Sequence, residues 1–356
     1  ILAVQSAVNY LCAHDSLRVK IRELLSRFHD MERLTQRIAL NRCAPRDIVA
    51  LRASLERIPA LHAALSDALK SDPNHEIALM LEAWDNLESC SALLNQSLVE
   101  NPPSLITDGG LFMPGYSKEL DDLLDMVEHG EQKLQALLEK EREASGLAKL
   151  KMGYNRVFGY YYELTRAQDK QIPAHFIRRQ SLANTARFTT EELKILEEKL
   201  LKASDEQKTL EYQLFVDLRS KIADMRAPLL DMSNRLAELD YWQCLAEAGR
   251  KNDWCMPKLT DDPMLILEGA RHPVVEEVTG RQNFVPNDLS LMPGKSFCLL
   301  TGPNMAGKST ILRQTALLCL MAQIGSPVPA THAKIGLCDR LFSRVGASDN
   351  LAQGES

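Results

Sequence analysis

The segment at residues 302–309, Gly-Pro-Asn-Met-Ala-Gly-Lys-Ser, constrains the fold of this chain more than any other feature. An apolar run at 297–301 precedes it and a helical pattern at 308–323 follows it, so we expect a strand, a loop and a helix in that order. Glycines let successive backbone N–H groups face phosphate oxygens, and the helix N-terminus adds the positive end of its dipole. In such a loop Lys308 supplies a cation between the β- and γ-phosphates, and the Ser309 hydroxyl binds Mg²⁺.

Hydrolysis of a bound nucleotide needs further residues that the sequence does not supply at the expected place. A carboxylate should end a short apolar strand, and another residue should position the attacking water. No apolar run ending in Asp-Glu follows residue 310, and we interpret Asp339 as a structural turn residue. Because only 47 residues follow Ser309, we expect the chain to end before the catalytic half of this domain.

Composition excludes several other classes of protein. The chain has 356 residues, 45% of them hydrophobic and 25% charged, which is typical of a globular protein of two or three domains. No apolar run is long enough to cross a membrane, and the first residues lack the basic start of a signal peptide. The eight cysteines form no CxxC pair, and neither HExxH nor GxSxG occurs, so a zinc site, a disulfide scaffold and a serine hydrolase lack support. We expect reduced thiols and a cytoplasmic protein.

Helical patterns flank a segment of different character. Residues 16–140 are expected to be mostly helical, with one helix from about 117 to 144. Residues 191–250 have two heptad-like stretches, with Pro228 as a break or a first-turn residue. Long helices on both sides of an insertion suggest an arm that carries something at its tip.

The insertion itself is dense in aromatic and basic residues. Residues 157–164 are expected to be β structure. The segment 151–188 holds seven basic and two acidic residues, a net charge of +5 in a chain whose overall charge is −6, and seven of the 20 aromatic residues. It is the one region where both charge and aromatic content favour nucleic acid.

Beyond residue 252 short apolar runs alternate with prolines. We expect strands at 264–267, 274–275 and 297–300, followed by the helix at 308–323. Strands followed by a helix indicate an α/β domain.

The residues around the glycine loop closely resemble the ATPase motif of the MutS family of DNA mismatch-repair proteins. The resemblance covers 301–310 and continues through Leu-Arg-Gln-Thr-Ala at 312–316, with Pro303, Asn304 and Met305 more specific than the loop spacing alone. Ala306 stands where many members carry a second glycine, and a small residue suffices there. Further stretches resemble family segments, namely 153–161, 178–182, 268–274, 284–287 and 339–347.

This resemblance implies a nucleotide site that binds ATP or ADP with Mg²⁺ and converts ATP to ADP and phosphate. It implies that Phe284 stacks on adenine, that Lys308 and Ser309 are catalytic, and that Ser309 holds the metal. A serine at the position of Ser356 would reach the nucleotide of a second subunit. The residues implied to line the nucleotide are Gly302, Pro303, Asn304, Met305, Ala306, Gly307, Lys308, Ser309 and Thr310.

The resemblance also implies a clamp that grips the backbone of double-stranded, mismatched DNA. Such contacts carry affinity and salt dependence but read no sequence. The implied partners are a second subunit of MutS type, as a homodimer, and a downstream repair factor of MutL type, with a nucleoid-associated place in a bacterial cytoplasm and no membrane. The implied DNA contacts are Lys151, Asn155, Arg156, Arg166, Lys170, Arg178, Arg179 and Asn184.

We therefore expect a multidomain α plus α/β protein in which a long-helix core and lever carries a β-rich clamp insertion. An incomplete P-loop ATPase domain follows it, and the family's mismatch-reading domain is not expected in this chain. The expected divisions are the end of a connector at 1–15, a helical core and lever at 16–146, the clamp at 147–189, returning lever helices at 190–250, and the ATPase region at 251–356.

The expected function is ATP-dependent mismatch recognition with switching between search and sliding-clamp states, and three alternatives stay open. A clamp-less MutS relative acting in recombination control would lack the insertion at 150–188. A coiled-coil P-loop ATPase of DNA organisation would carry a glutamine loop and an LSGG-type signature, and neither is found. A helical scaffold that binds nucleotide only structurally would show no ATP turnover.

Overall fold

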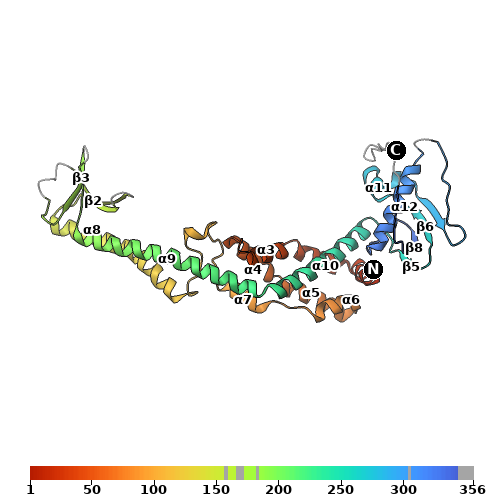
Figure 1. Ribbon diagram of the computed structural model, residues 1–356, viewed down its shortest axis with the longest axis horizontal. Coiled ribbons are helices and arrows are strands. Elements are labelled where there is room, and N and C mark those ends of the chain that lie inside the picture. Colours follow the sequence, from red (N-terminus) through yellow and green to blue (C-terminus); the bar gives the residue numbers. More distant parts are fainter. Residues whose placement is uncertain (156–158, 166–171, 182–183, 304–305, 344–356) are drawn as a thin grey trace. The chain divides into compact units, whose positions relative to one another are not determined.

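The computed structural model describes all residues except 156–158, 166–171, 182–183, 304–305 and 344–356 (Figure 1). Contacts divide the chain into two compact units, and the chain passes between them four times. Three of these passages lie within the helices α3 (Met31–Ala39), α4 (Pro45–Leu55) and α10 (Arg226–Lys251), and the fourth lies between Leu87 and Glu88. The first unit comprises Ile1–Glu32, Ala53–Leu87 and Ala227–Ser356, and the second comprises Arg33–Arg52 and Glu88–Arg226.

The helical part of the first unit is held by ion pairs as well as by its apolar core. Arg18 is buried, and its guanidinium contacts Glu247 at 2.9 Å and Asp15 at 2.6 Å. Asn74 caps the helix that follows it by accepting two backbone N–H groups, as expected for an N-cap asparagine. Besides most of α10, this part contains α1 (Leu2–Ala13), α2 (Asp15–Leu25), α5 (Ile58–Ser71) and α6 (His75–Glu82).

A four-stranded sheet and one long helix form the rest of the first unit. The strand order is β5-β8-β6-β7, with β5 and β8 parallel and the other pairs antiparallel. The helix α12 packs on this sheet through a cluster that includes Leu318, Ala270 and Ile335. The elements are β5 (Lys258–Thr260), β6 (Leu265–Ala270), α11 (Pro273–Thr279), the short helix η3 (Arg281–Asn283), β7 (Asn287–Leu291), α12 (Lys308–Gln323) and β8 (His332–Gly336).

Two strand predictions in this region are wrong. Residues 274–275 lie in α11, because His272 caps the helix and Pro273 occupies its first position, where proline is favoured. Residues 297–301 form no strand, and Phe297 and Leu299 are 82% and 76% exposed. A strand requires a neighbour to accept its hydrogen bonds, and no described strand pairs with this segment. The helix predicted at 308–323 is confirmed, and Asp339 lies in an exposed bend, as expected.

The second unit is built around two long helices that lie side by side (Figure 1). Lys140 and Glu192 form an ion pair between these helices at 2.8 Å, and Gly130 leaves room for Leu200, which a Cβ at that position would strike. Thr190 and Ser117 cap the two N-termini. The helical elements of this unit are α7 (Glu88–Asn95), η1 (Ile106–Asp108), α8 (Lys118–Ser145) and α9 (Glu191–Asp224).

The segment between α8 and α9 forms a small sheet. Of the β structure predicted at 157–164, residues 159–164 lie in a strand, and 157–158 lie outside the described residues. Four antiparallel strands run in the order β1-β2-β4-β3, namely β1 (Lys151–Asn155), β2 (Gly159–Thr165), β3 (Ile177–Ser181) and β4 (Thr185–Thr189). One face of this sheet packs on the ends of α8 and α9 through Tyr162, Phe188 and Leu193.

The long-helix predictions are confirmed within a residue or two. Gly146 ends α8 in the left-handed conformation, as a C-cap glycine does. The pattern at 191–250 becomes α9 and α10, and Pro228 lies in the first turn of α10. Among the helices that the structure describes, none combines the length and the apolar character that a membrane span requires.

Candidate nucleotide and nucleic-acid sites

The turn before α12 brings three of the predicted site residues together. Lys308 donates from Nζ to the carbonyl oxygens of Gly302 at 2.8 Å and Pro303 at 2.5 Å. Its ammonium group therefore lies over the start of the turn. Asn304 and Met305 lie outside the described residues, so their predicted contacts stay predictions.

Gly307 gives this turn its shape. Its φ of +81° is a left-handed value that favours glycine, and a Cβ at this position would meet no atom within 4 Å. Gly307 is also the N-cap of α12 and has no side chain to accept the first N–H groups of the helix. Those amides carry the positive end of the helix dipole and, like the Lys308 ammonium at the same turn, are suited to an anion.

The other predicted residues of this site are described but make fewer contacts. Ser309 and Thr310 lie half-buried in the first turn of α12, and Ala306 is exposed. Phe284 is half-buried and follows η3 directly. Ser356 lies outside the described residues. No group of three or more His, Cys, Asp or Glu side chains suited to a metal occurs among the described residues.

A buried polar cluster lies between the end of α10 and α11. Arg271 pairs with Glu276 at 2.6 Å, and Trp254 donates from its indole N–H to the same carboxylate at 2.9 Å. Both partners of the ion pair are buried, so each charge depends on the other. This cluster fixes the segment 271–276, whose first four residues belong to the stretch 268–274 that carries part of the family resemblance.

His272, in the same segment, is held neutral by its surroundings. Its Nδ1 accepts the N–H of Val275 at 3.3 Å, which leaves the proton on Nε2, a buried atom without a hydrogen-bond partner in the described structure. Burial lowers the pKa of this imidazole, and the positive charge of Arg313 in α12 lowers it further. The pKa of His272 therefore depends on Arg313, which lies in the second turn of α12.

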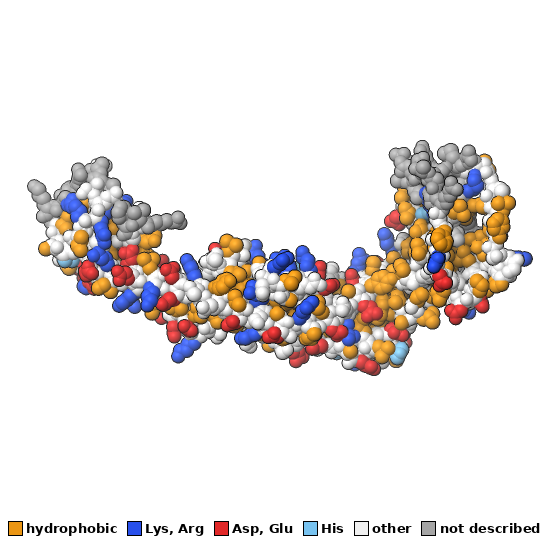
Figure 2. Space-filling view, viewed as in Figure 1, with side chains coloured by type: hydrophobic (Ala, Val, Ile, Leu, Met, Phe, Trp, Pro, Cys, Tyr) orange, Lys and Arg blue, Asp and Glu red, His pale blue; other side chains and the backbone are white. Residues whose placement is uncertain are grey.

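The outer face of the small sheet carries polar and aromatic groups. Arg187 lies at its centre, 3.2 Å from Glu163, 3.1 Å from the Gln180 oxygen and 4.4 Å from the centre of the Tyr161 ring. The Tyr161 ring lies close to Gly153, where a Cβ would come within 2.8 Å of it. Figure 2 shows blue Lys and Arg side chains over the described part of this sheet, at the left end of the view.

Five of the eight predicted DNA contacts are described, four on strands of this sheet and one just before β4. Lys151 and Asn155 lie on β1 at one edge, and Arg178 and Arg179 lie on β3 at the other. Asn184 is exposed just before β4. Lys151, Arg178 and Arg179 are exposed, although the Arg178 guanidinium also lies 5.1 Å from the centre of the Phe188 ring. Arg156, Arg166 and Lys170 lie outside the described residues.

The sequence analysis missed Arg187. Ala186 and Phe188 are buried on either side of it, so strand alternation places Arg187 on the outer face. That alternation over 185–189 was the available signal.

Comparison with known proteins identifies relatives of this chain. The chain is 54% identical over 378 residues to the DNA mismatch repair protein MutS of Desulfovibrio desulfuricans, in a match that covers 100% of this chain and 41% of that protein. The chain belongs to the MutS family. The model of MutS family domain IV matches residues 115–206, and that of MutS domain V matches residues 298–356.

Other members of the MutS family align over nearly the whole chain. The protein of the same name from Nitratidesulfovibrio vulgaris is 50% identical over 365 residues, covering 99% of this chain and 40% of that protein. The one from Methanosarcina barkeri is 41% identical over 351 residues, covering 98% of this chain and 39% of that protein. The chain thus spans about two fifths of the length of these curated MutS relatives.

Proposed function

We propose that this chain is the DNA-clamping and nucleotide-binding part of a mismatch-repair ATPase. The protein would hold duplex DNA through the sheet β1–β4 and switch between search and sliding states as nucleotide binds and is hydrolysed. The observation that carries the proposal is the glycine turn at the start of α12, with Lys308 folded over it, in a chain that also carries a cation-bearing sheet between two long helices.

The residues at the turn fit a nucleoside triphosphate with Mg²⁺. Gly307 leaves open space beside the backbone, and the first amides of α12 lack a side-chain acceptor. Lys308 would leave the Gly302 carbonyl to neutralise phosphate charge, and the Ser309 hydroxyl would hold Mg²⁺. The bound ATP would supply the γ-phosphoryl group, and water would accept it. The chain's own residues position the phosphates and stabilise their charge.

The sheet β1–β4 fits contacts with the phosphate backbone of DNA. Exposed cations at both of its edges, on β1 and β3, would neutralise phosphates without reading bases. The presence of this insertion between α8 and α9 argues against a clamp-less relative. A mismatch-dependent switch requires the γ-phosphate to contact the two states of the protein differently.

The remaining parts of the proposal concern partners. A second copy would place a serine at the position of Ser356 against the nucleotide of its neighbour, and a repair factor of MutL type would bind the nucleotide-loaded complex. A place in a bacterial cytoplasm near the nucleoid accords with these partners. The names of the relatives assign mismatch repair to those proteins, and we propose the same function for this chain.

Substitution of Lys308 tests the nucleotide site. In the full-length protein we expect Lys308→Ala to lower ATP turnover by about 100-fold, because removal of a charged contact to the transferred phosphate costs roughly 3 kcal/mol of transition-state stabilisation. The exposed Lys295, in a turn of the same unit, provides the matched control Lys295→Ala, which should retain turnover. Equal turnover in the Lys308 variant and the control would remove the nucleotide assignment, and no turnover in the unaltered protein would favour a structural scaffold.

Binding of matched and mismatched duplexes tests the repair assignment. We expect tighter binding of the mismatched duplex at 100 mM salt (a concentration of about this size leaves phosphate contacts measurable) and its release upon addition of ATP. Equal affinity for both duplexes, with and without ATP, would contradict mismatch recognition.

A further inference from the structure

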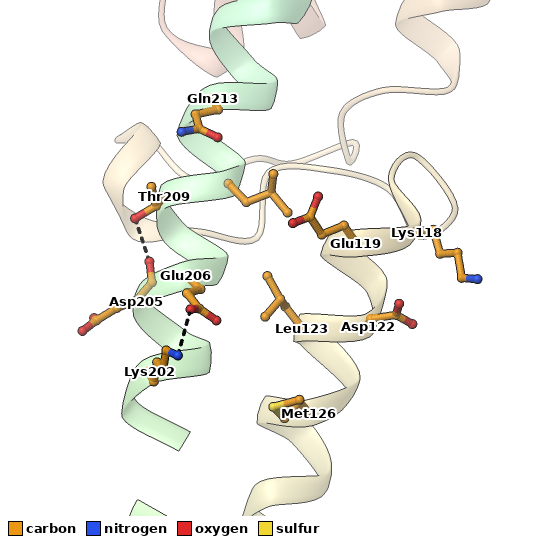
Figure 3. A pocket seen from close by; sticks show the side chains of 11 residues that line it. Lys118, Glu119, Asp122, Leu123, Met126, Lys202, Asp205, Glu206, Thr209 and Gln213 are labelled. Carbon is orange, nitrogen blue, oxygen red and sulfur yellow. Dashed lines mark hydrogen bonds and ion pairs between the residues drawn. The ribbon is translucent and has the colours of Figure 1, made fainter. Parts of the chain in front are cut away.

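The side of the α8–α9 pair carries a hollow with an acidic rim (Figure 3). Its volume is about 860 Å³, and Leu123 and Met126 of α8 lie toward α9 within it. Met126 is 48% exposed although its side chain is apolar. We name this hollow the acidic half, because a second hollow described next continues it along the helix pair. Its charged residues are Glu119, Asp122, Asp205 and Glu206 with Lys118 and Lys202.

A second hollow of about 390 Å³ lies between the same helices, nearer to the sheet. Its apolar lining includes Ile195, which is 49% exposed. We name it the basic half, and its charged residues are Lys133, Lys140 and Lys199 with Glu192.

Heptad spacing places both halves on the same side of the helix pair. In α8 the lining residues Glu119, Met126, Lys133 and Lys140 follow one another at intervals of seven. Positions seven apart differ by only about 20° around a helix, so they form one row. In α9 the residues 192, 199, 206 and 213 form a corresponding row. The two halves therefore form one groove, which the contact of Leu200 with Gly130 divides near its middle.

The charges of the groove change sign from one end to the other. The acidic half has four carboxylates and two lysines, and the basic half has three lysines and one carboxylate. Within the groove only Lys202 with Glu206 and Lys140 with Glu192 form ion pairs among the described residues. Glu119, Asp122 and Lys133 remain available for a partner.

We propose that this groove is a self-association surface on which a second copy of this chain packs in the antiparallel direction. A two-fold axis near Gly130 would place the acidic half of each copy against the basic half of the other. The same patch then serves both partners, as an isologous interface requires. The apolar side chains of Met126 and Ile195 become covered. This interface is separate from the nucleotide and DNA sites proposed above.

The size of the surface predicts a weak, salt-sensitive contact. The groove extends for about 31 Å between Glu119 and Lys140 at 1.5 Å per residue, and the helix pair is about 20 Å wide. Two copies would thus bury about 1,200 Å² together, the low end for specific interfaces. Because the complementary charges are exposed, association should weaken steeply as the salt concentration rises.

Zero-length cross-linking tests the arrangement directly. A mixture of isotopically light and heavy protein is treated with a carbodiimide, which joins only carboxylates and amines in contact. Lys140 and Glu119 of one chain lie about 31 Å apart along one helix, so a cross-link between them joins two copies. We expect Lys140–Glu119 and Lys133–Asp122 cross-links that combine light and heavy peptides at low salt. The absence of both, in protein at concentrations of tens of micromolar (roughly where weak contacts are populated), overturns the proposal.

Charge reversal supplies a second test by sedimentation. The variant with Glu119→Lys and Asp122→Lys has two positive halves, and the variant with Lys133→Glu and Lys140→Glu has two negative halves. We expect the salt-sensitive association of each variant alone to be at least tenfold weaker, while pairing of copies through the nucleotide site is unchanged. An equimolar mixture of the two should recover the salt-sensitive association of the unaltered protein.

The matched control reverses Glu128 and Glu139, exposed carboxylates of α8 that line neither half, and it should associate normally. Circular dichroism verifies that every variant is folded. If the mixture fails to associate while all variants are folded, the groove does not pair with a second copy. That outcome leaves the ATP and DNA assays unaffected, so it is distinct from failure of the proposed function.

Discussion

Glu211 illustrates how single residues hold this chain together. It is fully buried in α9, and its carboxylate accepts the N–H groups of Gly110 at 3.0 Å and Leu111 at 2.9 Å. The Gln207 amide donates to it as well, at 3.0 Å. A buried charge is stable only when such donors replace water. No local pattern in the sequence indicates that a helix residue 100 positions along the chain anchors this segment.

His272 leads to a prediction at the same scale. Its pKa is lowered below the ordinary value of 6.5 by burial and by Arg313, so protonation favours the unfolded state. Above pH 6.5 both states are neutral; as the pH falls below 6.5 the unfolded state takes up a proton first, and stability is lost. We expect His272→Asn, which keeps an N-cap acceptor, to flatten this part of the pH dependence.

The measurement is urea unfolding between pH 8 and pH 5.5 (a range chosen to bracket the ordinary histidine value). His75→Asn, at an exposed position of α6, is the matched control and should leave the pH dependence unchanged. An unaltered slope in the His272 variant would contradict the role of burial at this imidazole.

At the scale of elements, local signals predicted helices better than strands. The helix α12 has the predicted bounds because its N-cap glycine and its sequence both act within a few residues. The apolar segment 297–301 failed as a strand because strand formation depends on a partner elsewhere in the chain. Without such a partner, Phe297 and Leu299 of this segment are exposed.

Gly336 at the end of β8 provides an element-scale prediction. A Cβ at this position would lie 2.3 Å from the backbone oxygen of Asp262 and 3.0 Å from the backbone nitrogen of Met264. Because backbone atoms cannot rotate away, β8 would have to shift. We expect Gly336→Ala to lower the free energy of unfolding by about 2 kcal/mol, within the range for overpacking.

Urea unfolding measures this change, and Gly115→Ala is the control, since a Cβ there meets no atom within 4 Å and carries only the cost of a positive φ of +87°. A smaller loss for Gly336→Ala than for Gly115→Ala would show that the sheet adapts to the added methyl group.

At the scale of the whole molecule, the sheet β1–β4 is a small surface carried by two long helices. Its inner face is apolar and packs on α8 and α9, which leaves its outer face and edges available for a ligand. If the proposed function holds, this sheet supplies much of the affinity for DNA through charge.

We expect the combined variant Arg178→Ala, Arg179→Ala to bind matched and mismatched duplexes more weakly by the same factor. Removal of each arginine that neutralises a phosphate should reduce the slope of log affinity against log salt by about 1. Lys208→Ala, an exposed cation on α9 away from the sheet, is the control and should leave the slope unchanged. A weakening confined to the mismatched duplex would instead assign the two arginines to mismatch reading.

The sequence alone determined the long helices, the glycine turn, the β character of the insertion and its positive charge. These features depend on residue type and on the spacing of residues close together in the chain, both of which can be read from the sequence. The tertiary structure decided which strands pair, which side chains surround Arg187, and that Glu211 anchors the backbone at Gly110 and Leu111. All of these depend on contacts between residues far apart in the chain, and no local pattern encodes such contacts by itself.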